Sequence, residues 1–402
     1  MILTNNKSLK NRYAILIAIF VLLQFQAFSQ EVEKVIIGTK YKIESKILNQ
    51  ERSYIVNLPG SYKSDSTRTY PVIVLIDGGY YFNLFTGIIG EMANNGQVPE
   101  MIIIGLSKVD RVKDYTPTNS IISLNGSKDE NYLKTSGASK LFLDFIKKEL
   151  LVEIDSKYRT NSFKIMVGQS FGGLLAATSY LSSRSLFDGY IAIDPSFWWD
   201  DQYIIKQIDN INIEKIKNNY FYLSSADNYE NFYGATHIFE LNRNSHDSFY
   251  SKLMSKGISY SKIKIQYLEK ENHNTSPLLS LYNGLKFIYK DYFLKDIQTK
   301  SIDQINTYYR NIYGGKFLPP ESIINNLAYS NLRNEDSREL AIQFFKLNTL
   351  NYPNSFNAFD SLGEAYLLVN DKKKALDNYE KSFSLNPNNK NAKQIIEKLK
   401  KG

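Results

Sequence analysis

The sequence predicts an α/β fold: a doubly wound, mostly parallel sheet with helices on both faces, followed by a small all-helical C-terminal segment. From about residue 70 to residue 290, short apolar runs of strand type alternate with segments in which apolar residues recur at helical spacing. Such alternation is typical of a parallel sheet that is covered on both faces. Beyond Pro320 the strand pattern ends, and the sequence repeats with a period of 34 residues.

The composition favours a two-domain globular protein. A chain of 402 residues is long for one average domain, and 43% hydrophobic and 14% aromatic residues can bury a sizeable core. The formal net charge is +8, and Lys7, Lys10 and Arg12 at the N-terminus contribute part of it. Because no block of Lys and Arg occurs elsewhere, we expect no nucleic-acid partner.

Residues 1–29 have the pattern of a signal peptide. A basic start precedes an apolar run from Tyr13 to Leu23, and Ala27-Phe28-Ser29 predicts cleavage before Gln30. The run is short for a membrane span, so we expect no stable span after cleavage, although an uncleaved anchor remains an alternative. The chain has no cysteine, which is compatible with an oxidising compartment. The predicted location is therefore the periplasm or the outside of the cell.

The expected elements follow in order. Residues 33–59 alternate as an antiparallel hairpin, and residues 70–76 and 101–105 are buried strands with helix-compatible sequence up to about residue 95 between them. Residues 108–135 have no clear period. The later expected strands are 163–167, 190–193, 220–224 and 263–267, and the expected helices are 141–150, 174–181, 235–254 and 277–289. The predicted divisions are residues 30–295 for the α/β domain, 296–320 for a helical linker and 321–402 for the helical domain.

One motif within this pattern has the form of a nucleophile turn. Gly168-Gln169-Ser170-Phe171-Gly172 stands where a strand ends and a helix begins. A serine at so sharp a turn takes strained backbone angles, and its neighbours two residues away must lack a Cβ. The turn lifts the hydroxyl above the sheet, next to backbone N–H groups of a helix N-terminus. Ser170 is the predicted nucleophile, with a bystander serine in a glycine-rich turn as the alternative.

A serine hydroxyl needs a base, and the chain has 3 histidines. His273 lies in a loop after the last strand, at the sheet edge to which the serine points, so it is the predicted base. His237 and His246 lie in a helical segment, where a packed or exposed histidine is the simpler interpretation.

The acid of a triad must lie between the serine and the histidine in the sequence. The loop after Leu223-Ser224 offers Asp227, which we favour because its short side chain follows a strand end, and Glu230 as the alternative. Either residue can also be a solvated loop acid. The backbone N–H groups of Phe171 and Gly79 are the predicted oxyanion hole.

Two aromatic residues complete the predicted site. Tyr80, beside the oxyanion glycine, and Trp198 are candidate substrate-binding residues, although the Trp198-Trp199 pair can equally be buried packing. No phosphate-cradling motif or metal-ligand spacing occurs, so we expect no cofactor and no metal.

Between residues 34 and 292 the chain resembles the α/β-hydrolase esterase family that includes enterobactin-type siderophore esterases and, more distantly, feruloyl and acetyl esterases of carbohydrates. The runs that carry the resemblance are Leu75-Ile76-Asp77-Gly78-Gly79-Tyr80-Tyr81-Phe82, Asp110-Arg111-x-x-Asp114-Tyr115-Thr116-Pro117, Glu149-Leu150-Leu151-x-x-Ile154-Asp155-x-x-Tyr158-Arg159-Thr160, Gly168-Gln169-Ser170-Phe171-Gly172-Gly173, Asp194-Pro195-Ser196-Phe197-Trp198-Trp199 and Asn272-His273-x-x-x-Pro277-Leu278. The resemblance implies the α/β-hydrolase fold and hydrolysis of carboxylic esters, with Ser170 and His273 at matching positions. Near Asp227 the chain departs from the family pattern, because Ala226 stands where a glycine is expected.

The C-terminal repeat resembles a tetratricopeptide unit. Ala341, Phe345 and Pro353 recur as Ala375, Tyr379 and Pro387. Fewer than three full repeats are rarely stable alone, so we expect the segment to pack on the α/β domain. Its two interpretations are recruitment of a protein partner through residues 321–402 and a structural brace.

These observations predict an exported serine carboxylesterase that acts through an acyl-enzyme on a small-molecule or glycan ester. Siderophore lactones, feruloylated or acetylated glycans and simple acyl esters all remain open as substrates. The alternative is a catalytically idle hydrolase scaffold that presents the helical repeats to a partner.

Overall fold

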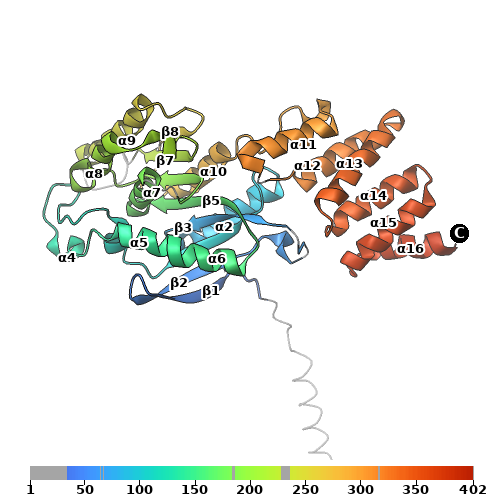
Figure 1. The fold of residues 1–402 in the computed structure, drawn as a ribbon, viewed down its shortest axis with the longest axis horizontal. Coiled ribbons are helices and arrows are strands. Elements are labelled where there is room, and N and C mark those ends of the chain that lie inside the picture. Colours follow the sequence, from blue (N-terminus) through green and yellow to red (C-terminus); the bar gives the residue numbers. More distant parts are fainter. Residues whose placement is uncertain are drawn as a thin grey trace, which may run out of the picture. The chain divides into compact units, whose positions relative to one another are not determined.

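Eight strands form one sheet in the order β1-β2-β4-β3-β5-β6-β7-β8 (Figure 1). The computed structural model describes residues 34–63, 65–66, 68–182, 186–227, 236–315 and 317–401. Strands β1 and β2 form an antiparallel hairpin and β2 pairs antiparallel with β4, whereas every other neighbouring pair is parallel. The strands are Thr39–Ser45 (β1), Gln50–Asn57 (β2), Tyr70–Leu75 (β3), Ile102–Ser107 (β4), Thr160–Gln169 (β5), Gly189–Ile193 (β6), Tyr220–Ala226 (β7) and Ile263–Leu268 (β8).

Helices cover both faces of the sheet, and further helices follow it in the chain. The helices of the α/β part are Gly78–Asn94 (α2), Arg111–Tyr115 (α3), Glu130–Leu133 (α4), Ser139–Phe145 (α5), Leu151–Lys157 (α6), Phe171–Leu181 (α7), Trp199–Gln207 (α8), Thr236–Ser255 (α9) and Ser276–Ile288 (α10). The C-terminal helices are Ile302–Asn311 (α11), Glu321–Leu332 (α12), Arg338–Asn351 (α13), Phe356–Leu368 (α14), Lys372–Leu385 (α15) and Lys390–Lys401 (α16). This is the predicted fold class, an α/β fold with a mostly parallel sheet and an all-helical C-terminal segment.

The sheet divides the core into two layers. Residues of α5, α6, α7, α8 and α9 pack on one face. Residues of α2 and α10 pack on the other face and continue into a cluster with α11 to α14. The inner strands β3 to β6 are almost continuously buried because both their faces are covered.

The strand order places a topological switch point between β3 and β5. From β3 the chain first crosses to β4 on one side and later returns to β5 on the other side. In open α/β sheets, ligands bind beyond the carboxyl ends of the strands at such a point. Gly78 and Gly79 begin α2 just after β3, and Ser170 follows β5, so both lie at this switch point.

Three stretches add detail that the sequence pattern did not show. The aperiodic residues 108–135 contain the short helices α3 and α4, whose N-caps Asp110 and Asp129 accept hydrogen bonds from the backbone N–H groups of Lys113 and Tyr132. The expected helix 141–150 is interrupted by a π-helical turn at Ile146–Leu150. The expected helical linker contains α11, which begins with a capping box at Ser301 and Gln304.

The C-terminal helices share one apolar core with the α/β part. Helix α12 packs against α13 and α14 against α15. Just before α12, the ring of Phe317 packs edge-on against Phe163 of β5 and against Tyr289 and Tyr292 beyond α10. The Tyr352 ring after α13 lies 5.4 Å from the guanidinium of Arg68. The expected packing of the segment on the α/β part is therefore present, whereas the predicted domain boundaries and the type of repeat stay predictions.

The predicted signal peptide lies outside the described residues. No helix within the described residues is both long and apolar enough to cross a membrane.

We predict that Phe317→Ala destabilises the whole protein. The side chain is 8% exposed and contacts four aromatic rings, so its removal leaves a cavity that costs about 3–5 kcal/mol. Chemical denaturation measures the decrease in the free energy of unfolding. It is followed by the fluorescence of the 2 tryptophans of the chain, which lie in the α/β part. The exposed Leu350→Ala, at 78% exposure, is the matched control and changes little. An unchanged denaturation midpoint for Phe317→Ala would show that the helical segment does not stabilise the sheet.

Candidate active site

Ser170 stands on a strained turn between β5 and α7. Its backbone angles are φ 59° and ψ −116°, outside the regions that non-glycine residues ordinarily occupy. A Cβ at Gly168 would lie 2.2 Å from the carbonyl oxygen of Gly172, and a Cβ at Gly172 would lie 2.3 Å from the Asp77 carboxylate. Both glycines are therefore required by close approach, which is the geometry that the sequence motif predicts.

The predicted oxyanion donors stand at the first turns of two helices. Phe171 is the first residue of α7, and Gly79 is the second residue of α2. The first N–H groups of a helix have no acceptor within the helix, so both groups can donate to a developing oxyanion. The strands that carry them are adjacent, since the N–H group of Ile76 donates to the carbonyl oxygen of Val167 at 2.9 Å.

The hydroxyl of Ser170 has a neighbour that the sequence analysis did not single out. The Ser170 and Ser196 Oγ atoms are 3.1 Å apart, and the backbone N–H of Ser196 donates to the Ser170 carbonyl oxygen at 3.1 Å. Ser196 is 4% exposed. Its place three residues after the end of β6, the strand next to β5, is the signal that would have pointed to it.

His273 lies between β8 and α10, at the same edge of the sheet as Ser170. Its Nδ1 atom is 2.6 Å from Oδ2 of Asp194, and its carbonyl oxygen accepts a hydrogen bond from the Gln169 side chain at 3.1 Å. No hydrogen bond joins the two described side chains of Ser170 and His273. Hydrogen bonds of this kind are often long in unliganded enzymes and shorten when the substrate binds.

The carboxylate on His273 belongs to Asp194, whereas the sequence analysis favoured Asp227. Asp227 faces another partner, Nη1 of Arg243 at 3.4 Å. Both aspartates follow a strand end and both lie between the serine and the histidine in the sequence, so chain order does not separate them. Asp194 follows β6 and Asp227 follows β7, and the His273 loop reaches the first of them. The alternative acid Glu230 lies outside the described residues.

Asp194 is held rigidly and stays ionised. It is 1% exposed, and its Oδ1 atom accepts a hydrogen bond from the backbone N–H of Ala226 at 3.0 Å. Burial raises its pKa, but the hydrogen bond and charge of His273 outweigh burial, so the pKa lies below the usual value of an aspartate. Asp194 can therefore fix the imidazole tautomer and stabilise an imidazolium.

A second buried histidine supports the Asp194 loop. His246 of α9 is fully buried, with Nδ1 2.9 Å from Oγ of Ser225 and Nε2 2.6 Å from the carbonyl oxygen of Pro195. A carbonyl can only accept, so Nε2 carries the proton and Nδ1 accepts from the serine. Burial lowers the pKa of His246, which keeps the ring neutral. The packed interpretation of His246 is confirmed, and the side chain of His237 lies outside the described residues.

An ion pair braces the other side of the nucleophile turn. Arg111 donates from Nε to Asp77 at 2.8 Å and from Nη2 to the Gln169 carbonyl oxygen at 2.9 Å. The second oxygen of Asp77 accepts from the Gln169 N–H at 2.9 Å. Burial raises the pKa of Asp77, and Arg111 opposes that effect. The sequence analysis assigned neither residue a role, although both lie in the runs that carry the family resemblance.

The two predicted substrate-binding residues lie on different sides of the site. Tyr80 is 79% exposed and lines a pocket of ≈ 430 Å³ with Gly79, Lys108, Arg111 and Tyr132. Trp198 is half-buried and its ring lies 6.0 Å from that of Phe171, beside the predicted oxyanion hole. Trp199 is fully buried, so the buried-packing interpretation holds for this member of the pair. Within the described residues, no group of three or more His, Cys, Asp or Glu side chains could hold a metal ion.

Comparison with known proteins finds similarity to an esterase family over part of the chain. Residues 45–229 match the family described as "Putative esterase". The ferri-bacillibactin esterase BesA of Bacillus subtilis (strain 168) is 27% identical over 193 residues, which cover 45% of this chain and 66% of that protein. The chain thus spans about two thirds of the length of this curated relative. Over the matched residues the chain is therefore similar to esterases.

Two solved structures show the same fold. An IroE-like serine hydrolase from Shewanella oneidensis matches with a TM-score of 0.67 at 27% identity, over 78% of this chain and 99% of that chain. An uncharacterised protein from Capnocytophaga ochracea DSM 7271 matches with a TM-score of 0.56 at 17% identity, over 91% of this chain and 100% of that chain.

Replacing Asp194 by Asn separates the two candidate acids. The change keeps the side-chain volume but removes the charge that holds the His273 tautomer, so we expect kcat for p-nitrophenyl acetate to fall by up to roughly 10⁴-fold. Asp227→Asn removes only the partly exposed pair with Arg243 and is expected to change kcat by less than about threefold. The opposite ranking would return the acid role to Asp227.

His246→Phe is predicted to lower kcat and to flatten the pH dependence of stability. A depressed folded-state pKa means that the unfolded chain binds the proton more readily, so the stability from neutral His246 is complete above about pH 6.5 and is lost as the pH falls through the folded-state value. Urea denaturation between pH 7.5 and 5 measures this slope, which the phenylalanine variant lacks. His246→Gln, which retains a donor for the Pro195 carbonyl, is expected to recover part of kcat. Equal kcat in both variants and the parent would remove His246 from any positioning role.

Proposed function

We propose that this protein, whose residues 45–229 match the family described as "Putative esterase", is an exported serine carboxylesterase that hydrolyses a siderophore-type ester or lactone. The observation that carries the proposal is the placement of Ser170, Asp194 and His273 beyond the carboxyl ends of β5, β6 and β8 of one sheet, with the Asp194–His273 contact at 2.6 Å. Such a constellation serves acyl transfer through a covalent intermediate.

The geometry suits each step of that reaction. Ser170 Oγ attacks the ester carbonyl while His273 takes its proton, and the charged imidazolium is stabilised by Asp194. The N–H groups of Phe171 and Gly79 stabilise the oxyanion, and the alcohol departs with the proton from His273. A water molecule then attacks the acyl-enzyme with His273 again as base, which releases the acid and restores Ser170.

The siderophore-type substrate rests on the similarity to BesA and on the aromatic lining of the site. Tyr80, Tyr132 and Trp198 expose ring surface around Gly79 and Phe171, and an aryl acyl group stacks on such surfaces. Feruloylated glycans also carry an aryl acyl group, so a carbohydrate ester is the second candidate. Periplasmic or secreted location is proposed from the pattern of residues 1–29 alone.

The C-terminal helices have two proposed roles. Their shared core with the α/β part, through Phe317 and Tyr352, supports a brace. Recruitment of a protein partner through residues 321–402 rests on the repeat pattern, and it is the basis of the alternative in which the hydrolase part is an idle scaffold.

Covalent labelling separates the enzyme from the idle scaffold. We expect a fluorophosphonate probe to label the full chain once, at Ser170, and Ser170→Ala to abolish both labelling and ester turnover. Ser196→Ala is the matched control, because it removes the neighbouring hydroxyl at 3.1 Å but leaves the nucleophile. A folded parent that neither labels nor hydrolyses any ester would support the idle scaffold. A substrate panel of catecholate siderophore lactone, feruloylated sugar and acetylated xylan then ranks the classes, and the proposal expects the lactone to give the highest kcat/KM.

A further inference from the structure

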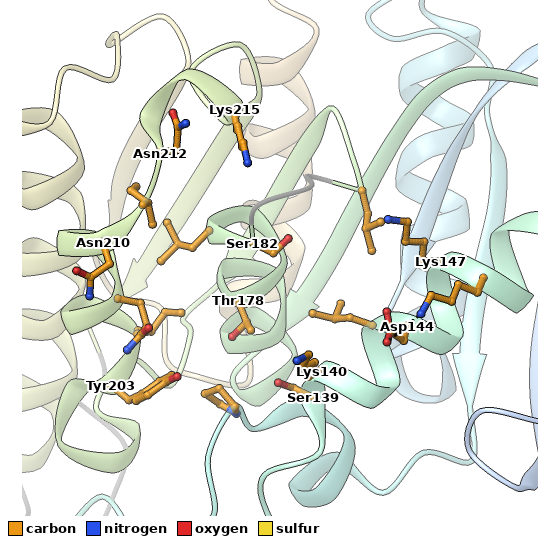
Figure 2. A pocket seen from close by; sticks show the side chains of 18 residues that line it. Ser139, Lys140, Asp144, Lys147, Thr178, Ser182, Tyr203, Asn210, Asn212 and Lys215 are labelled. Carbon is orange, nitrogen blue, oxygen red and sulfur yellow. Dashed lines mark ion pairs between the residues drawn. The ribbon is translucent and has the colours of Figure 1, made fainter.

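A cavity of ≈ 770 Å³ lies away from the catalytic residues (Figure 2). Its walls come from α5, the π-helical turn at Ile146–Leu150, the second half of α7, and α8 with the residues that follow it. Thr178 in its wall is more than two turns beyond Ser170 along α7, roughly 12 Å at 1.5 Å per residue. Neither Ser170, Asp194 nor His273 lines it, so it is separate from the proposed active site.

Three lysines from different elements surround this cavity without acidic partners. Lys140 belongs to α5, Lys147 to the π-helical turn and Lys215 to the 3₁₀ turn at Ile213–Lys215, and Figure 2 shows them around the central residues Thr178 and Ser182. Within the described part of the chain, no carboxylate forms an ion pair with any of the three. The one carboxylate in the lining, Asp144, already pairs with Lys148 at 3.2 Å.

Glu149, the acidic residue of the π-helical turn, forms its hydrogen bonds with residues outside the cavity. Glu149 accepts hydrogen bonds from Oγ of Ser45 at 2.5 Å and from the backbone N–H groups of Lys46 and Ile47 at 3.0 and 3.2 Å. Its carboxylate therefore holds the β1–β2 hairpin and leaves Lys147 without a counter-ion. Uncompensated cations that converge on a cavity with low-dielectric walls create a field that attracts anions.

The inner wall of the cavity is apolar. Leu143, Leu181, Leu186, Ile204 and Ile211 contribute its aliphatic surface. The two central hydroxyls already donate within α7, from Thr178 to the Leu174 carbonyl oxygen at 2.8 Å and from Ser182 to the Ser179 carbonyl oxygen at 2.7 Å. The lysines are therefore the charged donors that the lining offers to an anionic group.

From this arrangement we propose that the cavity binds a small amphiphilic anion, with an apolar aryl or acyl body against the aliphatic wall and a carboxylate paired with the lysines of the lining. The lysines and the aliphatic wall together favour a ligand that is both charged and apolar. A neutral apolar molecule would leave the lysine charges unpaired, and a small hydrophilic anion would leave the aliphatic wall in water. The inference is independent of the proposed esterase activity.

The test compares three probes that differ in one property each. The anion 2-naphthoate, its neutral counterpart 2-naphthamide and the anion acetate are titrated calorimetrically into the full chain carrying Ser170→Ala, which prevents covalent chemistry. We expect naphthoate to bind, and naphthamide and acetate to bind at least about tenfold more weakly, because each lacks one of the two required interactions.

Substitutions then locate the binding. Lys147→Gln and Lys215→Gln are expected to weaken naphthoate binding about tenfold each, as befits loss of a charge-assisted hydrogen bond, without changing naphthamide binding. Lys390→Gln in α16 is the matched control for a generic loss of positive charge, and thermal denaturation checks that every variant folds. Absence of naphthoate binding, equal binding of naphthoate and naphthamide, or unchanged binding in the Lys147→Gln/Lys215→Gln double variant would each overturn the proposal. Ester hydrolysis by the parent is measured separately, so failure of naphthoate binding does not contradict the proposed esterase activity, and the reverse also holds.

Discussion

The contact between the carboxylate of Asp194 and the imidazole of His273 is the interaction on which the proposed chemistry depends. It joins the end of β6 to the loop after β8 across the end of β7, and it places a fixed negative charge behind the histidine. The buried partners of Asp194 compensate this charge, whereas an unpaired buried carboxylate would be strongly destabilising. His246 then holds the next residue, Pro195, from the opposite side.

The strained serine is supported in the same manner. A non-glycine residue at φ 59° costs on the order of 1–3 kcal/mol, which the surrounding contacts must offset. Asp77 accepts a hydrogen bond from the backbone N–H of Gln169, and Arg111 donates one to its carbonyl oxygen. The Gln169 side chain in turn donates to the His273 carbonyl oxygen. Gln169 therefore connects the turn that carries Ser170 to the loop that carries His273. This coupling explains how the three reacting groups can be preorganised by elements far apart in the sequence.

The sequence predicted those features whose signals are local. The glycines around Ser170, the continuous apolar runs of the inner strands and the position of His273 after the last strand each depend on a few neighbouring residues. The sequence did not separate Asp194 from Asp227 as the candidate acid, because both have the same local pattern, a carboxylate directly after a buried strand. Only the three-dimensional path of the His273 loop decides between them. Ser196, the contacts of His246 and the lysine-lined cavity were missed for the same reason, since their partners lie on other elements.

The central claim is that Asp194 fixes the tautomer of His273, and the 3 histidines of the chain make that directly observable. Nitrogen-15 NMR of protein labelled only at histidine distinguishes Nδ1–H from Nε2–H rings. We expect slowly exchanging ring protons on Nε2 of His246 and on Nδ1 of His273. The His273 signal should persist in Asp227→Asn and disappear or shift to the Nε2–H form in Asp194→Asn. A His273 signal that survives Asp194→Asn and is lost in Asp227→Asn would contradict the account.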